Sequence, residues 1–110
     1  MQEHFIQYLW QYQYFNQKEL ETDCGKKLQV IKPGFLNQLA GPDFKEAHLL
    51  IDDIEWHGSV EIHVKASEWK RHGHQGDANY DNVILHVVYE NDYRVKNPNN
   101  QPIPTLTLRG

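Results

Sequence analysis

The chain has 110 residues, of which 39% are hydrophobic and 24% charged, enough for one small domain with a single core. Its formal charge of −4 counts against binding nucleic acid through basic side chains alone, and the lone Cys24 excludes an intramolecular disulfide framework and a cysteine-based zinc site. No stretch approaches the roughly 20 apolar residues of a membrane-spanning helix, and the start lacks the pattern of a secretory signal. We expect a single domain over residues 1–110, in a reducing cytoplasm.

A helix and a hairpin are predicted first. Apolar residues recur with helical spacing within residues 3–15, which predicts an amphipathic helix: Phe5, Tyr8, Leu9 and Tyr12. Two short alternating runs flank Asp-Cys-Gly within residues 18–31 and favour a β-hairpin. A helical turn opened by an Asn16/Glu19 capping pair competes for residues 16–21.

The middle of the chain predicts two strands. Pro-Gly and Gly-Pro pairs indicate a loop over residues 32–44. Residues 47–51 and 54–65 then read as strands joined by an Asp-Asp turn, with Gly58 as a candidate bulge.

A crossover and two further strands follow. Ser67 is placed to cap a short helix, and the near-continuous apolar run 83–89 predicts a strand buried on both faces. Residues 103–109 alternate and predict an edge strand. Because a crossover fits between Lys65 and Val83, the buried strand can run parallel to its neighbour. The fold class expected is α+β, with one mixed sheet flanked by helices.

The strand 54–65 presents two different faces, because successive side chains alternate. One face is apolar and typical of a core: Val60, Ile62 and Val64. The other carries Glu61, His63 and Lys65. A carboxylate, an imidazole and an ammonium in a row indicate either a solvated face with cross-strand ion pairs or the floor of an active site.

Asp43 supplies a second carboxylate for the same region. It stands just before one strand of the predicted hairpin, and Glu61 lies on the other, so pairing can bring them within several ångströms. Two carboxylates at that range repel unless a cation lies between them. Hard oxygen ligands without cysteine suit Mg²⁺ or Mn²⁺.

This arrangement resembles the PD-(D/E)xK nuclease superfamily, whose core runs helix, three strands, helix, strand. Its members carry an Asp after a Pro ahead of the second strand and a Glu-x-Lys on the third. Pro42-Asp43 and Glu61 match, but His63 stands where the lysine is expected, and Lys65 follows roughly 6.6 Å further on. The resemblance implies a restriction-endonuclease-like core and a nuclease with Asp43 and Glu61 as metal ligands. The basic role stays open between His63 and Lys65.

The whole chain also resembles an uncharacterised bacterial family of unknown function, found mainly in Bacteroidetes. The likeness rests on Gly-Pro-Asp-Phe at 41–44, Val-Glu-Ile-His at 60–63 with the downstream Trp69, His-Gly-His at 72–74, and the stretch 80–92. Members of that family are generally longer, which implies that this chain is their N-terminal portion. The family implies no activity.

Histidines are the one compositional excess, with seven in the chain. His72 and His74, together with His63 and Glu61, form a candidate zinc-like site with an open position. His86 alternates with apolar neighbours, so we expect it to be buried and to need a hydrogen-bond partner or a metal.

Three functions fit these features. The first is a Mg²⁺- or Mn²⁺-dependent phosphodiesterase or nuclease, with Asp43 and Glu61 as ligands, His63 or Lys65 assisting the attacking water, and His72 or His74 contacting phosphate. The second is a non-catalytic interaction module on a degenerate nuclease-like fold. The third is a histidine-zinc hydrolase. The first predicts nucleic acid as partner.

Overall fold

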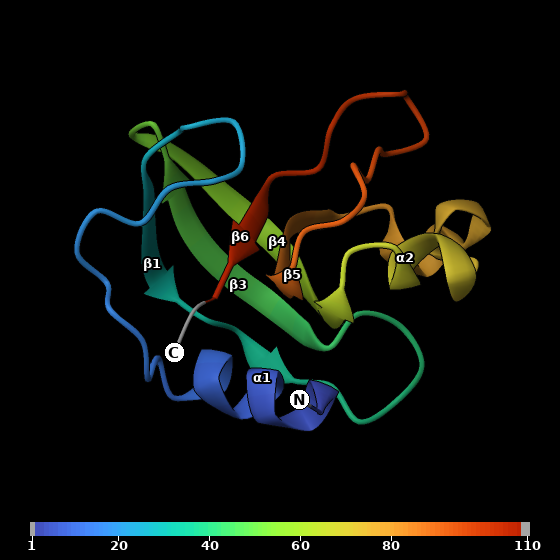
Figure 1. Ribbon diagram of the computed structural model, residues 1–110, viewed down its shortest axis with the longest axis horizontal. Coiled ribbons are helices and arrows are strands. Elements are labelled where there is room, and N and C mark those ends of the chain that lie inside the picture. The colour runs from blue at the N-terminus through green and yellow to red at the C-terminus, as the bar shows by residue number, and fades with distance from the viewer. Residues whose placement is uncertain (1, 109–110) are drawn as a thin grey trace.

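The computed structural model describes residues 2–108 (Figure 1). The helices are α1 (Glu3–Gln11), α2 (Glu68–Arg71) and the 3₁₀ turns η1 (His74–Gly76) and η2 (Ala78–Tyr80). The strands are β1 (Leu28–Lys32), β2 (Phe35–Leu36), β3 (Phe44–Ile51), β4 (Ile54–Lys65), β5 (Val83–Glu90) and β6 (Thr105–Thr107). None of the helices within this range is long and apolar enough to cross a membrane.

One mixed sheet forms the centre of the molecule, as predicted. The strand order is β1-β3-β4-β5-β6, and β2 pairs with the start of β3. Strands β1, β3 and β4 are antiparallel neighbours, whereas β4, β5 and β6 run parallel. The α+β label fits only loosely, because the sheet is curled and the helices are few and short.

The N-terminal elements are shorter than their patterns predicted. Helix α1 ends at Gln11 rather than at residue 15, and Gln13 adopts a positive φ of 56° that a helix cannot continue. No helix forms over residues 16–21, where the Asn16 side chain accepts the Lys18 backbone N–H instead. The predicted hairpin is reduced to a single bridge between Glu21 and Lys27 ahead of β1.

The predicted hairpin of β3 and β4 is confirmed, and its first strand starts earlier than predicted. Strand β3 begins at Phe44, and its register with β4 shifts between Phe44 and Ala47, where Glu46 has a positive φ of 61°. Gly58 is not itself the bulge, since the β4–β5 register shifts between Ser59 and Val60. A Cβ on Gly58 would lie 2.5 Å from the Asn82 carbonyl oxygen. The close approach of β4 to the backbone just before β5 therefore requires glycine at position 58.

The C-terminal strands lie where they were expected. The buried run forms β5, parallel to β4. The last strand, β6, is limited to Thr105–Thr107 and pairs with β5 at the end of the sheet. Arg109, at the end of the predicted strand, lies outside the described residues.

The two faces of the sheet differ in chemistry. One face packs against α1 and forms the main core, to which Ile6 and Trp10 contribute from the helix. The other face carries Glu61, paired in register with His86, and lies under the connection 66–82. This connection contains α2, which confirms the predicted crossover between two parallel strands.

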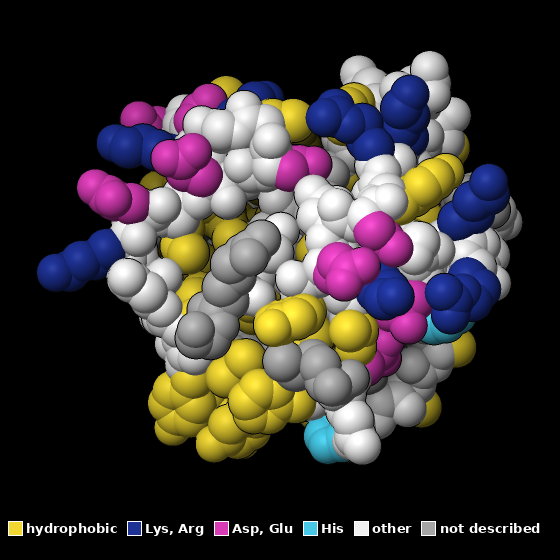
Figure 2. All heavy atoms as spheres, in the orientation of Figure 1, with side chains coloured by type: hydrophobic (Ala, Val, Ile, Leu, Met, Phe, Trp, Pro, Cys, Tyr) yellow, Lys and Arg dark blue, Asp and Glu magenta, His cyan; other side chains and the backbone are white. Residues whose placement is uncertain are grey.

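Apolar side chains also gather on the outside of α1. Figure 2 shows them as a yellow patch over the region where α1 lies in Figure 1. Exposed aromatic residues of this segment account for it: Phe5, Tyr8, Tyr12 and Tyr14.

Candidate functional site

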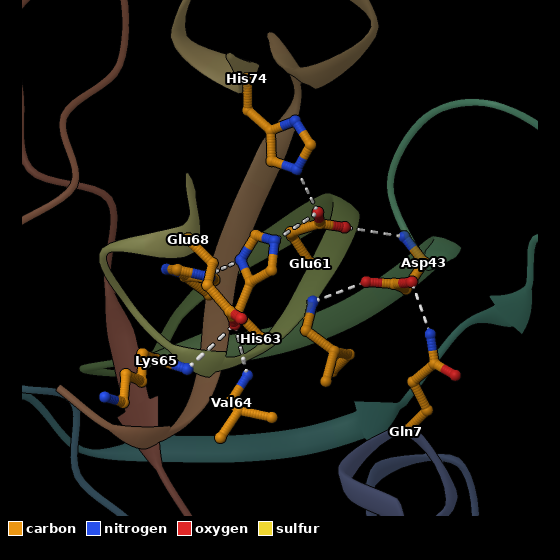
Figure 3. Close-up of polar contacts among 10 residues, drawn as sticks. Gln7, Asp43, Glu61, His63, Val64, Lys65, Glu68 and His74 are labelled. Atoms are coloured by element: carbon orange, nitrogen blue, oxygen red, sulfur yellow. Dashed lines mark hydrogen bonds and ion pairs between the residues drawn. The ribbon is translucent and has the colours of Figure 1, made fainter. Parts of the chain in front are cut away.

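Asp43 and Glu61 hold each other in place across the β3–β4 pair. The Asp43 backbone N–H donates to Glu61 Oε1 at 3.1 Å, and the Ile62 backbone N–H donates to Asp43 Oδ2 at 2.8 Å. Each carboxylate is therefore bonded by the backbone of the opposite strand, and the two side chains face one another (Figure 3). The structure brings together the two carboxylates that hairpin pairing predicted.

Helix α1 adds two polar groups that the sequence did not reveal. Gln7 Nε2 donates to Asp43 Oδ1 at 2.6 Å, so both oxygens of that carboxylate are engaged (Figure 3). Glu3, one helical turn earlier, lies close enough to be affected by the Asp43 charge. Burial, then Asp43 and Glu68, raise the pKa of Glu3 to about 7. The charge of Glu3 thus acts on the Asp43–Glu61 pair from α1.

The second oxygen of Glu61 faces two histidines. His74 Nε2 lies 2.7 Å from Glu61 Oε2, and His63 Nε2 lies 3.4 Å from the same oxygen. The His74 nitrogen is buried and is not aligned with any acceptor as a hydrogen bond requires. Burial, reinforced by the hydrogen bond and the charge of the Asp43 side chain, raises the pKa of Glu61 to about 10. Without a cation, this carboxyl group keeps its proton at neutral pH.

Two buried imidazoles lie deeper in the same face. His63 Nδ1 and His86 Nε2 are 2.7 Å apart, which gives His86 the hydrogen-bond partner expected for a buried histidine. Burial, followed by the neighbouring histidines 86, 74 and 72, lowers the pKa of His63 to about 2. Burial, followed by His74, lowers that of His86 to about 3. Both rings are neutral at neutral pH, so one N–H is shared between them.

The crossover connection brings His72 and His74 over this face. Helix α2 ends at Arg71 with His72 as its C-cap, and Gly73 takes the left-handed conformation, with φ of 74°. The reversal turns both imidazoles toward His63, whose ring centroid lies 5.1 Å from that of His72 and 5.2 Å from that of His74. Tyr80 stacks on His74 with ring centroids 3.8 Å apart, which fixes the orientation of that imidazole.

Lys65 does not join the group. It is exposed at the end of β4, and Figure 3 shows its ammonium pointing away from the carboxylates. Glu68 Oε2 instead accepts the backbone N–H groups of Val64 and Lys65, at 3.0 and 3.1 Å. Of the two basic candidates from the sequence, the structure places only His63 beside Glu61.

Basic side chains line a cleft beyond Trp69. This cleft, of about 590 Å³, is lined by Trp69, Lys70, Tyr93, Arg94, Lys96 and Asn100. No ion pair joins its cations to a carboxylate among the described residues. Trp69 also contacts His74 and His86 edge-on, so the tryptophan separates the cleft from the histidines.

A second group of potential metal ligands lies elsewhere on the β3–β4 hairpin. His48, Glu55 and His57 have donor atoms within 4.8 Å of one another. His48 Nε2 is 2.9 Å from Glu55 Oε1, and the two imidazoles stack at 4.1 Å. Glu55 and His57 are exposed, and neither contacts the carboxylate pair.

The comparisons with known proteins identify the family. A family model described as "Protein of unknown function (DUF2851)" matches residues 3–110. The chain belongs to this family. It has no significant match among curated proteins or among solved structures. The family match confirms the resemblance to a domain family of unknown function.

Proposed function

We propose that this protein is a divalent-cation-dependent phosphodiesterase, acting on nucleic acid. The observation that carries the proposal is the reciprocal carboxylate pair, in which Asp43 and Glu61 each accept a backbone N–H from the opposite strand. Two half-buried or buried carboxylates held face to face need a proton or a cation between them. Their oxygens are hard ligands, suited to Mg²⁺ or Mn²⁺.

The order of elements supports the same proposal. A helix, three antiparallel strands, a short helix and a parallel strand follow one another as α1, β1, β3, β4, α2 and β5. This is the order of the PD-(D/E)xK core, and Asp43 and Glu61 occupy the matching positions at the start of the second strand and within the third. Strands β2 and β6 have no counterpart in that order of elements.

Each residue of the site would have a separate role in phosphodiester cleavage. A cation on Asp43 and Glu61 would lower the pKa of a bound water and offset charge developing on phosphorus. Gln7 would keep Asp43 oriented, because it bonds the oxygen that the backbone leaves free. His63 is the basic candidate beside Glu61, and because its pKa is lowered to about 2, its neutral Nε2 would orient the attacking water by accepting a hydrogen bond rather than by taking its proton. We therefore assign the role beside the cation to His63 rather than to Lys65.

The cleft beyond Trp69 supports an anionic polymer as substrate. Lys70, Arg94 and Lys96 place positive charge there although the whole chain carries a formal charge of −4. Phosphates of a nucleic acid strand would replace counterions at these side chains, and the bond to be cleaved would lie on the carboxylate side of Trp69. Alanine substitution of Lys70 and Arg94 should weaken binding and reduce its dependence on salt.

The experiment is calorimetric titration of Mn²⁺ and Mg²⁺, followed by cleavage assays on single- and double-stranded DNA and RNA. We expect saturable binding by the wild type, its loss in Asp43→Asn and Glu61→Gln, and cation-dependent cleavage lost in the same variants. Affinity should rise about tenfold per pH unit between pH 6 and 8, because the cation must displace the Glu61 proton. Asp52→Asn, in the exposed turn after β3, is the matched control.

Two outcomes would contradict the proposal. Cleavage that persists in Asp43→Asn and Glu61→Gln would trace the activity to another site or to a contaminant. A folded wild type that binds neither cation would leave the carboxylate pair as a protonated structural contact and favour the interaction module instead.

A further inference from the structure

Three histidines converge on the side of Glu61 that faces away from Asp43. We call His63, His72 and His74 the histidine trio. One nitrogen from each lies within 4.8 Å of the other two. The trio draws on two separate parts of the chain, since His63 belongs to β4 and the other two flank Gly73 in the crossover.

The spacing of the three rings matches a shared tetrahedral ion. Zinc binds histidine nitrogen at about 2.0–2.1 Å, and three imidazoles around one tetrahedral zinc therefore have ring centroids about 5 Å apart. The centroids of the trio are separated by 5.1 Å (His63–His72), 5.2 Å (His63–His74) and 5.6 Å (His72–His74).

Two of the rings are already oriented as metal ligands. His63 uses Nδ1 for its contact with His86, which leaves Nε2 facing the trio, and metal-bound histidines characteristically have the other ring nitrogen engaged in this way. His74 is fixed by stacking on Tyr80, and its buried Nε2 has no aligned hydrogen-bond partner. The close polar neighbour of that nitrogen is Glu61 Oε2, 2.7 Å away in poor alignment, and a cation bound by both groups would replace this contact.

Glu61 lies beside two members of the trio. Ligand atoms of one tetrahedral zinc lie about 3.4 Å apart, so the 3.4 Å from Glu61 Oε2 to His63 Nε2 already fits, whereas the 2.7 Å to His74 Nε2 would have to lengthen. His72 is exposed, so an ion has a route from solvent to the buried members.

We propose that His63, His72, His74 and Glu61 bind a late first-row divalent cation, Zn²⁺ in the first instance, at a position separate from the carboxylate pair. Nitrogen-rich sets of this kind favour Zn²⁺ over Mg²⁺, which prefers oxygen. The inference concerns cation binding alone and holds whether or not the protein cleaves phosphodiesters. Glu61 and His63 take part at both positions, whereas Asp43 belongs only to the carboxylate pair and His72 and His74 only to the new site.

The test is a Zn²⁺ titration of the apo protein against a chromogenic chelator, with X-ray absorption at the zinc edge to count imidazole ligands. The variants are His72→Ala and His74→Ala, chosen because they lie outside the sheet. We expect one tight site with three imidazoles in the wild type. Removal of a residue that only supports a ligand typically costs about 10–100-fold in metal affinity. Each variant removes a ligand itself, so we expect a larger loss.

Two matched controls separate this site from its neighbours. His57→Ala removes a ligand from the exposed group on the β3–β4 hairpin and should leave the tight Zn²⁺ site unchanged. Asp43→Asn should lose Mn²⁺ binding while keeping Zn²⁺, so failure of the proposed function and failure of this inference give different results. Circular dichroism and thermal melts without metal establish that each variant is folded.

Either of two results would overturn the inference. One is a wild type without a tight Zn²⁺ site. The other is an affinity that survives in folded His72→Ala and His74→Ala but falls in His57→Ala, which would assign the ion to the hairpin surface.

Discussion

Neighbouring residues of β4 are about equally buried, but their burial has opposite effects on the stability of the fold. Ile62 is 0% exposed and belongs to the core beneath α1, whereas Glu61 is 4% and His63 1% exposed on the other face. Burying Ile62 stabilises the fold through the hydrophobic effect. Burying a carboxyl group and an imidazole costs stability unless partners satisfy them. One face of the sheet therefore stabilises the fold, while the other retains polar groups whose burial lowers stability and which we connect with function.

The largest expected effect is on the apolar face. Ile62→Ala should lower the free energy of unfolding by about 2–5 kcal/mol, because it leaves a cavity in a closely packed core. Urea denaturation at pH 6.5 with a chelator measures this. The control is Ile54→Ala on the same strand, where the side chain is 61% exposed and the change should stay within about 0.5 kcal/mol. Equal losses in both variants would contradict the two-face description.

On the polar face, stability should depend steeply on pH. Below pH 6.5 the unfolded chain protonates His63 and His86, whereas the folded chain resists until their lowered pKa values of about 2 and 3. Each of them therefore removes about 1.4 kcal/mol of unfolding free energy per pH unit as the pH falls. Glu61 acts in the opposite sense, since the folded chain keeps its proton up to about pH 10 and the unfolded chain releases it near 4.5.

Together these groups predict a maximum of stability near pH 6.5 in the apo protein. Above pH 6.5 the raised pKa values of Glu61 and, up to about pH 7, of Glu3 make stability fall as the pH rises. Between pH 4.5 and 6.5 these two acids offset His63 and His86, and the lowered pKa of His74 makes stability fall slightly toward acid. Below pH 4.5 the histidines act unopposed, so stability falls more steeply. Denaturation midpoints from pH 3 to 9 test the shape. A flat profile from pH 5 to 8 would show that the polar face is not held in the protonation states described above.

A single substitution on the polar face should remove the fall in stability above pH 6.5. Glu61→Gln keeps the shape of the protonated side chain but has no proton to lose, so it should stabilise the apo protein by at least about 1 kcal/mol at pH 8. Its effect at pH 4.5 should be small. Thermal melts at both pH values measure the difference. Glu55→Gln, on the same strand and the same face but 66% exposed, should change neither. A destabilised Glu61→Gln at pH 8 would mean that the ionised carboxylate is the favoured state.

The polar face could be predicted where it depends on local rules. Alternation along β4 placed Glu61 and His63 side by side, and hairpin pairing brought Asp43 to them, because period and register act between neighbouring residues. The buried run around His86 was predicted from composition alone.

The rest depended on tertiary packing. Gln7 bonds Asp43, and Glu3 lies near enough to be affected by its charge, only because α1 crosses the start of β3 at an angle that helical periodicity does not specify. The positions of His72 and His74 depend on the left-handed turn at Gly73 and on stacking with Tyr80. The His-Gly-His stretch carried part of that signal, since glycine after a helix often adopts this conformation.

Lys65 provides the smallest expected effect and the sharpest contrast with His63. Alternation assigns both residues to one face, but β4 extends past the cover of the crossover, so Lys65 is exposed while His63 is buried. Lys65→Ala should change the free energy of unfolding by less than about 0.5 kcal/mol and leave the Mn²⁺ and Zn²⁺ affinities unchanged. Titration calorimetry and melts on this variant test both points. A loss of cation-dependent cleavage in a Lys65→Ala variant that keeps its metal affinity would show that the lysine turns inward during the reaction and would assign the basic role to it. Unchanged affinity would mean that alternation along a strand identifies the residues that share a face. It does not determine which of those residues belong to the site.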